Sequence, residues 1–211
     1  MLNGELPDPL GARLACVCLP SSPAVVLGST QPASDFDREQ LAARGLELVR
    51  RRSGGGAVLV APEWQVWLDV FVPSGDVLAA ADVGRSFHWL GVTYAAAIAS
   101  MLGTPEVAVE VHREPTRDSP WSKVLCYAGL GFGEVTVAGR KVVGMSQRRD
   151  RSGAWIHSMA LLSDHATDLA DLLAGSAEHR SAARAVLEET GLRDAEHLAR
   201  LLTEELLRRL P

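Results

Sequence analysis

Apolar and polar positions alternate along the chain in a way that divides it into a strand-rich part and a helical part. From Arg13 to Leu162, short apolar and β-branched runs predict strands, and their short connections favour antiparallel pairing. The candidate strands are Leu14–Cys18, Val25–Leu27, Ala57–Val60, Val66–Phe71, Val107–Val111, Val124–Tyr127, Val135–Val137 and Lys141–Met145, with a further apolar strand at Trp155–Leu162. This spacing indicates a sheet of mainly antiparallel strands.

Helical spacing interrupts the strands twice and then takes over the end of the chain. The two interruptions are Asp37–Arg44, closed by Gly45, and a longer pattern from about Gly84 to Leu102, closed by Gly103. After Ser163 the expected helices are His165–Leu173, Ala177–Thr190 and Ala195–Leu210, the last with Asp194 as N-cap and a leucine stripe that packs on the sheet. The patterns predict an α+β fold: a mixed, largely antiparallel sheet flanked by helices, with a helical C-terminal tail. We expect a main domain over residues 13–162 and a helical extension over 163–211 packed on it.

Composition excludes several classes of protein. The 211 residues are 47% hydrophobic and 22% charged, as in a folded soluble protein. The 21 Lys and Arg against 26 Asp and Glu give a net charge of -5, so no basic field exists to hold nucleic acid or anionic lipid. Met1–Pro9 carries Glu5 and Asp8 without a basic or apolar stretch, and no apolar run approaches the roughly 18–20 residues that span a bilayer. We therefore expect a cytoplasmic protein with no nucleic-acid or membrane partner.

Cysteine and histidine spacing predicts neither a disulfide framework nor a metal site. The chain has three cysteines, and Cys16 and Cys18 alternate on one face of a candidate strand rather than forming a C-x-x-C motif. The six histidines are scattered. We expect no resident metal.

Lysine is rare, and one of the two lysines stands where chemistry is expected. Only Lys123 and Lys141 occur among the 21 basic residues, and Lys141 directly follows Arg140 at the start of the second strand of a predicted hairpin. A compact ammonium can point at a single oxygen, which a planar guanidinium cannot do. Gly144 and Ser146 follow, and both are small enough to leave a groove floor open.

A run of arginines and glycines forms a second candidate site. Arg50 to Arg52, Ser53 and Gly54 to Gly56 precede a clear strand; the glycines let the backbone approach a ligand, and the arginines offer forked donors to a carboxylate or phosphate. A glycine-rich turn with solvated arginines is the alternative. His157 lies inside an apolar strand, either as a core residue or as a pocket residue. The glycines of residues 129–133 precede a strand, so they are not a dinucleotide fingerprint, which must open a helix.

Three ordered motifs make the chain resemble the lipoate–protein ligase A family. RRSGGGAV at residues 51–58, EVTVAGRKVVGMSQRR at 134–149 and His157-Ser158 are similar to the family's R-R-x-G-G-G, its hairpin ending in G-[RK]-K-[VIL]-x-G-x-[AS], and its H-G-[ST] segment. The family belongs to the biotin/lipoate protein ligase catalytic-domain superfamily, which includes octanoyltransferases. The resemblance implies the biotin/lipoate ligase-like fold and an apolar tunnel for an eight-carbon acyl chain.

The resemblance also implies roles for single residues. Lys141 would contact the acyl carbonyl or the acyl-phosphate oxygen, where a fixed cation stabilises the charge that develops during acyl transfer. The acyl group would be bound by Arg51, Arg52, Ser53, Gly54, Gly55, Gly56, Gly144, Ser146 and His157. The substrates would be a lipoate or octanoyl donor, with ATP and Mg²⁺ if the protein is a ligase, and the partner a lipoyl-domain carrier of a dehydrogenase complex or the glycine-cleavage system.

The sequence departs from the ligases in ways that leave other mechanisms open. Gly133-Glu134 stands where ligases of the family carry Asn-Asp, and Ser158-Met159 replaces Gly-[ST] after the histidine. Cys126, fifteen residues before Lys141, resembles the C-[FY] element with which octanoyltransferases and lipoyl amidotransferases form an acyl thioester. The sequence therefore predicts protein-lysine lipoylation by a ligase-like enzyme, with two alternatives: a transferase that uses a Cys126 thioester, or a non-enzymatic acyl-binding module.

Overall fold

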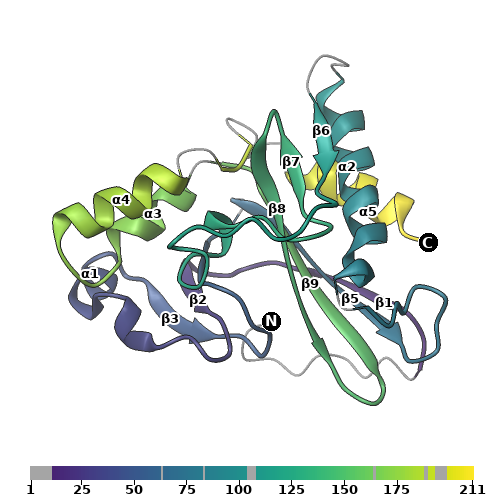
Figure 1. The fold of residues 1–211 in the computed structure, drawn as a ribbon, viewed down its shortest axis with the longest axis horizontal. Coiled ribbons are helices and arrows are strands. Elements are labelled where there is room, and N and C mark those ends of the chain that lie inside the picture. Colours follow the sequence, from purple (N-terminus) through teal and green to yellow (C-terminus); the bar gives the residue numbers. More distant parts are fainter. Residues whose placement is uncertain are drawn as a thin grey trace.

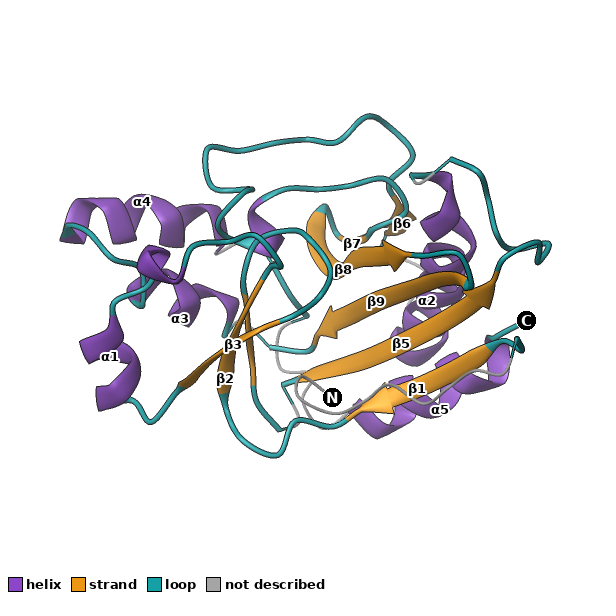
Figure 2. Ribbon diagram, turned by 90° about the horizontal axis from the view of Figure 1, so that it is seen from below, coloured by secondary structure: helices purple, strands orange, loops and turns teal. Residues whose placement is uncertain are grey.

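The strands form two sheets. The computed structural model describes residues 11–62, 64–82, 84–103, 108–163, 165–187, 190–192 and 199–211. Six of the described strands make an antiparallel sheet in the order β1 (Leu14–Cys18), β5 (Gln65–Pro73), β9 (Gly153–Leu161), β8 (Arg140–Arg149), β7 (Val135–Val137) and β6 (Val109–Val111). A smaller sheet has the order β3 (Glu47–Arg50), β2 (Ala24–Leu27) and β4 (Val58–Val60), with β2 parallel to β3 and antiparallel to β4. The long β5, β8 and β9 form the centre of the larger sheet (Figure 2).

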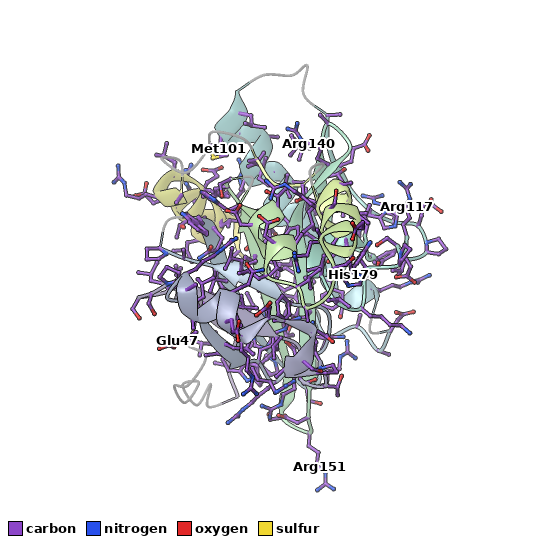
Figure 3. All side chains as sticks on the ribbon, turned by 90° about the vertical axis from the view of Figure 1, so that its left-hand side faces the viewer. Glu47, Met101, Arg117, Arg140, Arg151 and His179 are labelled. Atoms are coloured by element: carbon purple, nitrogen blue, oxygen red, sulfur yellow. The ribbon has the colours of Figure 1, made fainter. Side chains whose placement is uncertain are left out.

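The helices lie on opposite sides of the molecule. Figure 1 places α1 (Arg38–Ala43), α3 (Ala166–Asp171) and α4 (Ala177–Leu187) at the left, beside the small sheet, and α2 (His88–Leu102) and α5 (Ala199–Arg209) at the right. Short 3-10 helices cover Ala33–Asp35, Arg85–Phe87 and Cys126–Ala128. The long β8–β9 hairpin extends from the body, and Arg151 at its tip points away from the rest of the molecule (Figure 3).

Two hydrophobic clusters use the two faces of the large sheet. Leu68 and Ile156 point to the face that α2 and α5 cover, and they pack with Ile98 and Leu202 of those helices. Residues one position along each strand point the other way. These include Trp67 and Met159, which join the cluster of the small sheet, α3 and α4. The second face therefore packs its apolar side chains against the small sheet and its helices.

Local signals explain the element ends. The Asp37 side chain caps α1 by accepting from the backbone N–H of Glu39 and Gln40, and Gly103 ends α2 with a φ of +63°. Ala138 and Gly139, with φ of +50° and +78°, make the two-residue turn between β7 and β8 that such hairpins favour. The turn sets Lys141 at the second position of β8.

The predicted fold class is confirmed, and two details of the prediction are wrong. The apolar run at residues 124–127 is not a strand: it enters a 3-10 helix at Cys126–Ala128 and keeps one isolated bridge, between Ala57 and Leu125. The longer helix begins at His88 after a 3-10 turn rather than near Gly84. The predicted N-cap Asp194 lies outside the described residues. The division of the chain into a main domain and a helical extension at residue 162 stays a prediction; α3 and α4 pack in one hydrophobic cluster with the small sheet. No described helix is long and apolar enough to cross a membrane.

Candidate active site

An apolar pocket lies between the two sheets. Its walls come from Val26 and Val58 of the small sheet and from Trp67, Met145 and Met159 of the large one, and it has an empty volume of about 380 Å³. Most of the exposed lining is apolar, and a small set of polar groups interrupts it: Arg51, Cys126, Ser146, His157 and Ser158. An apolar cleft with a few convergent polar groups is the usual form of a small-molecule site. The pocket brings together Arg51, Cys126, Gly144, Ser146 and His157 of the predicted site; Arg52, Ser53 and Gly54 to Gly56 are not among its lining residues.

Cys126 is held in place by backbone pairing with the glycine-rich segment. Its N–H donates to the carbonyl of Ala57 (3.0 Å), and the N–H of Ala57 donates to the carbonyl of Val124 (2.8 Å). Gly56 makes this approach possible, because a Cβ there would stand 2.7 Å from the Leu125 backbone and 2.8 Å from the Cys126 nitrogen. No side chain fits at position 56 without displacing the cysteine segment.

The two arginines of the motif point in different directions. The Arg51 guanidinium turns inward and donates to the carbonyls of Gly54 (2.8 Å) and Gly56 (2.9 Å), and burial lowers its pKa. Gly55 between them has a φ of +96°, a conformation that favours glycine. Arg51 therefore shapes the glycine-rich loop and lines the pocket, whereas Arg52 is exposed and is not among the lining residues.

Ser53 and Ser146 join the glycine-rich loop to the large sheet. Ser53 is buried, and its Oγ lies 2.9 Å from the Oγ of Ser146 on β8. Gly144, two residues earlier on the same face, leaves the space that the cysteine segment occupies: a Cβ there would lie 3.3 Å from the Tyr127 ring and 3.5 Å from the Cys126 Sγ. The Tyr127 hydroxyl donates to the Met159 carbonyl and accepts from the Gly144 N–H.

Lys141 is buried, and protein atoms occupy all of its donors. Its ammonium donates to the carbonyls of Cys126 (2.9 Å) and Gly129 (2.8 Å) and pairs with the Glu134 carboxylate at 2.6 Å. An ammonium has three N–H groups, so an acyl oxygen can bind Nζ only in exchange for one of these partners. In the described state, Lys141 fixes the segment that carries Cys126.

Both carboxylate oxygens of Glu134 also have partners. Its Oε2 accepts from the Gly131 N–H (2.6 Å) besides pairing with Lys141, and its Oε1 accepts from the Met145 N–H (3.0 Å). This residue stands where ligases of the family carry an Asn-Asp pair, but its oxygens are directed at Lys141, Gly131 and Met145, and it is not among the residues that line the pocket. Among the described residues, no group of three or more His, Cys, Asp or Glu side chains could hold a metal ion.

A buried Asp–His pair was not predicted from the sequence. Asp69 on β5 lies opposite His157 on β9, and its Oδ1 accepts from the His157 Nδ1 (2.9 Å) and the Trp67 Nε1 (2.7 Å). Asp69 is 3% exposed. One signal existed in the sequence: this aspartate is the charged residue of the otherwise apolar strand prediction Val66–Phe71.

The other two cysteines, Cys16 and Cys18, do not line this pocket. Burial raises the pKa of both thiols, that of Cys18 to about 12, and the nearby Asp69 carboxylate raises both further. Both lie on β1, opposite Asp69 and Trp67. A raised pKa keeps a thiol protonated at neutral pH and therefore poorly nucleophilic.

Known proteins resemble this chain in sequence. The profile of the lipoyl protein ligase A/B catalytic domain matches residues 13–205. The chain is 31% identical over 150 residues to the octanoyltransferase LipM of Moorella thermoacetica, covering 71% of this chain and 53% of that protein. It is 32% identical over 145 residues to the octanoyltransferase LipM of Exiguobacterium sp., covering 66% and 51% respectively.

A solved structure shares the fold. The bipartite lipoate protein ligase of Thermoplasma acidophilum, studied with its E2 lipoyl domain, superposes with a TM-score of 0.68 at 15% identity over 93% of this chain and 69% of that one. The chain spans about half the length of the curated relatives that it matches. Because the family profile covers nearly all of the sequence, the chain belongs to the lipoyl protein ligase A/B catalytic domain family.

Proposed function

We propose that the protein transfers an octanoyl or lipoyl group to a lysine of a lipoyl-domain carrier protein through a thioester on Cys126. The observation that carries the proposal is the position of this thiol: it lines an apolar pocket, on a segment fixed by Ala57, Lys141 and Tyr127. A nucleophile held in one geometry beside its substrate removes much of the entropic barrier to reaction.

The rest of the pocket suits a medium-length acyl chain. The walls of Val26, Val58 and Met159 bury apolar surface, which stabilises such a chain by about 0.8 kcal/mol per methylene group. In the proposal, the acyl group also meets Arg51, Arg52, Ser53, Gly54, Gly55, Gly56, Gly144, Ser146 and His157. The names of the two curated relatives support octanoyl transfer as the reaction class.

Lys141 acts in this proposal chiefly as a support. It donates to the Cys126 carbonyl and so fixes the backbone that carries the thiol. A fixed cation near the acyl carbonyl favours the oxyanion that forms when the thiolate attacks.

ATP-dependent ligation is the second candidate, since the superposed Thermoplasma protein is a lipoate protein ligase. Ligation requires residues that can hold ATP and Mg²⁺. Glu134 does not fit a magnesium site because its oxygens bind Lys141, Gly131 and Met145. The transferase is therefore favoured.

Mass spectrometry separates the candidates. The protein is incubated with apo lipoyl domain and either an octanoylated acyl-carrier protein or lipoate with ATP, and the carrier and the enzyme are weighed. We expect octanoyl transfer without ATP, together with an octanoyl adduct on the wild-type enzyme that Cys126→Ser lacks.

Each other result excludes the thioester proposal. ATP-dependent transfer at a near-native rate by Cys126→Ser would establish the ligase. Tight binding of octanoate without a mass shift on any carrier would indicate an acyl-binding module.

A further inference from the structure

We propose that His157 is the proton acceptor of the transfer and that Asp69 is the positioning residue that aims it at Cys126. The inference rests on the proposed thioester function and adds a role that the cysteine and lysine alone do not supply. Acyl transfer through a thiol needs a group that takes the Cys126 proton and later the proton of the incoming amine.

Lys141 cannot be that group in the described geometry. All three of its N–H groups donate to protein acceptors, so the nitrogen is an ammonium without a lone pair. Its side chain is 7% exposed and is paired with the Glu134 carboxylate at 2.6 Å. A base must therefore be found elsewhere in the pocket.

His157 has the required orientation. Its Nδ1 is fixed by Asp69, and since a carboxylate only accepts, Nδ1 carries the proton. In a neutral ring, Nε2 then holds the lone pair. Nε2 has no hydrogen-bond partner within the part of the chain that the structure describes, and the residue lines the pocket.

The strand register brings the imidazole to the thiol. His157 pairs with Ser146, and Gly144 lies two residues along β8 on the same face. The Cys126 Sγ sits over Gly144, 3.5 Å from where a Cβ would be. Diagonal neighbours of this kind are roughly 7–8 Å apart between their backbone positions. Cys126 and His157 both line the pocket, so the imidazole and the thiol face the same space, where a proton can pass directly or through one water.

Asp69 is itself held by a second donor. The Trp67 indole N–H donates to the same Oδ1 that accepts from His157, so the carboxylate cannot rotate without losing both bonds. Asp69, His157 and Ser146 occupy directly paired positions on β5, β9 and β8. The orientation of the His157 ring is thus set by regular strand pairing rather than by a loop.

The proton balance closes in both half-reactions. In the first, the Cys126 S–H proton moves to Nε2, Sγ bonds to the acyl carbon, the donor's acyl–sulfur bond breaks, and Nε2 returns the proton to the departing sulfur. In the second, the neutral amine of the carrier lysine bonds to the acyl carbon and the bond to Sγ breaks. The amine's proton passes to Nε2 and then to Sγ. No oxidant or reductant is needed.

The decisive variant is Asp69→Asn, with Asp168→Asn as its matched control. Asp168 also binds a histidine Nδ1, that of His165 at 3.0 Å, but this pair is outside the pocket and more than a third exposed. An asparagine that donates to Nδ1 stabilises the wrong tautomer of His157, as loss of an orienting carboxylate does in catalytic triads. We expect kcat for octanoyl transfer to fall by about 10²- to 10⁴-fold with KM nearly unchanged, and Asp168→Asn to match wild type.

Two measurements separate positioning from a loss of structure. Long-range ¹H–¹⁵N NMR should show the Nδ1–H tautomer at His157 in wild type and a changed tautomer population in Asp69→Asn. His157→Gly should be inactive and recover activity when free imidazole is added.

The failures are distinguishable. A wild-type protein that transfers no acyl group overturns the proposed function. An active wild type with an undiminished Asp69→Asn, an unchanged tautomer or no imidazole rescue overturns only the roles of His157 and Asp69.

Discussion

Two buried carboxylates lie beside the pocket, and they leave their basic partners in different states. Glu134 and Lys141 close on each other and on neighbouring backbone groups until no donor of the lysine remains. Asp69 binds one nitrogen of His157 and leaves the other open. A carboxylate next to a basic side chain can therefore either help to occupy all of its hydrogen-bonding groups or orient it and leave one nitrogen accessible. The first arrangement builds the site, and the second is available for chemistry.

The largest effect on stability is expected from the removal of Lys141. Lys141→Met leaves the Glu134 carboxylate buried without its counter-ion, and breaking a buried pair in this way costs about 3–5 kcal/mol. We expect the free energy of unfolding, measured in urea, to fall by that amount. The double variant Lys141→Met with Glu134→Gln should recover much of the loss because the uncompensated charge is gone.

An exposed pair supplies the control for this experiment. Arg200 and Glu204 lie 3.3 Å apart on α5 with both side chains more than half exposed, so Arg200→Ala should change the unfolding free energy by about 1 kcal/mol or less. A loss for Lys141→Met no larger than that of Arg200→Ala would contradict the structural role of the lysine.

A second change tests the opposite side of the cysteine segment. Gly56→Ala places a methyl group 2.7 Å from the Leu125 backbone, and such overpacking costs about 1–3 kcal/mol. We expect a lower melting temperature and a larger fractional loss of transfer than of stability, because the thiol moves with the segment. Gly54→Ala is the matched control for stability alone, since a Cβ there meets no atom within 4 Å. Equal melting temperatures of the two variants would show that the close approach does not constrain the Cys126 segment.

The smallest expected effect concerns the other thiols. At pH 8, iodoacetamide should modify Cys126 and spare Cys18, whose pKa is raised to about 12 by burial and by Asp69. The Asp69 carboxylate also raises the pKa of the Cys16 thiol, and Asp69→Asn removes it. The pKa of Cys16 should therefore fall, and this thiol should be alkylated several-fold faster in the variant than in wild type. Peptide mass mapping reads both sites. Unchanged labelling of Cys16 would mean that burial alone protects it.

Much of the fold could be predicted because its signals are local. The β7–β8 hairpin is set by Ala138 and Gly139, and α2 by its terminal Gly103. The apolar segment around Cys126 could not be assigned in the same way, because a buried loop and a buried strand have the same hydropathy. What bends this segment is the contact of Leu125 and Cys126 with Ala57 and of Cys126 with Lys141, partners far from it in sequence.

The candidate site shows the same limit. The glycine-rich motif, Cys126 and Lys141 could be found from spacing and resemblance, but the directions of Arg51 and Arg52 depend on which carbonyls fold back toward them. The Asp69–His157 pair depends on the register of β5 against β9. Register is fixed by the whole buried face of a sheet, not by either residue alone.

The bond between Cys126 and Ala57 also has a consequence for the order in which the molecule folds. It joins segments about seventy residues apart, whereas the β7–β8 hairpin closes through a two-residue turn, and contacts that enclose long loops form late. The thiol therefore reaches its working position later than the β7–β8 hairpin forms. Chains that have folded only such local hairpins lack a positioned nucleophile that could be acylated prematurely, and the Cys126 amide should stay open to hydrogen exchange in them.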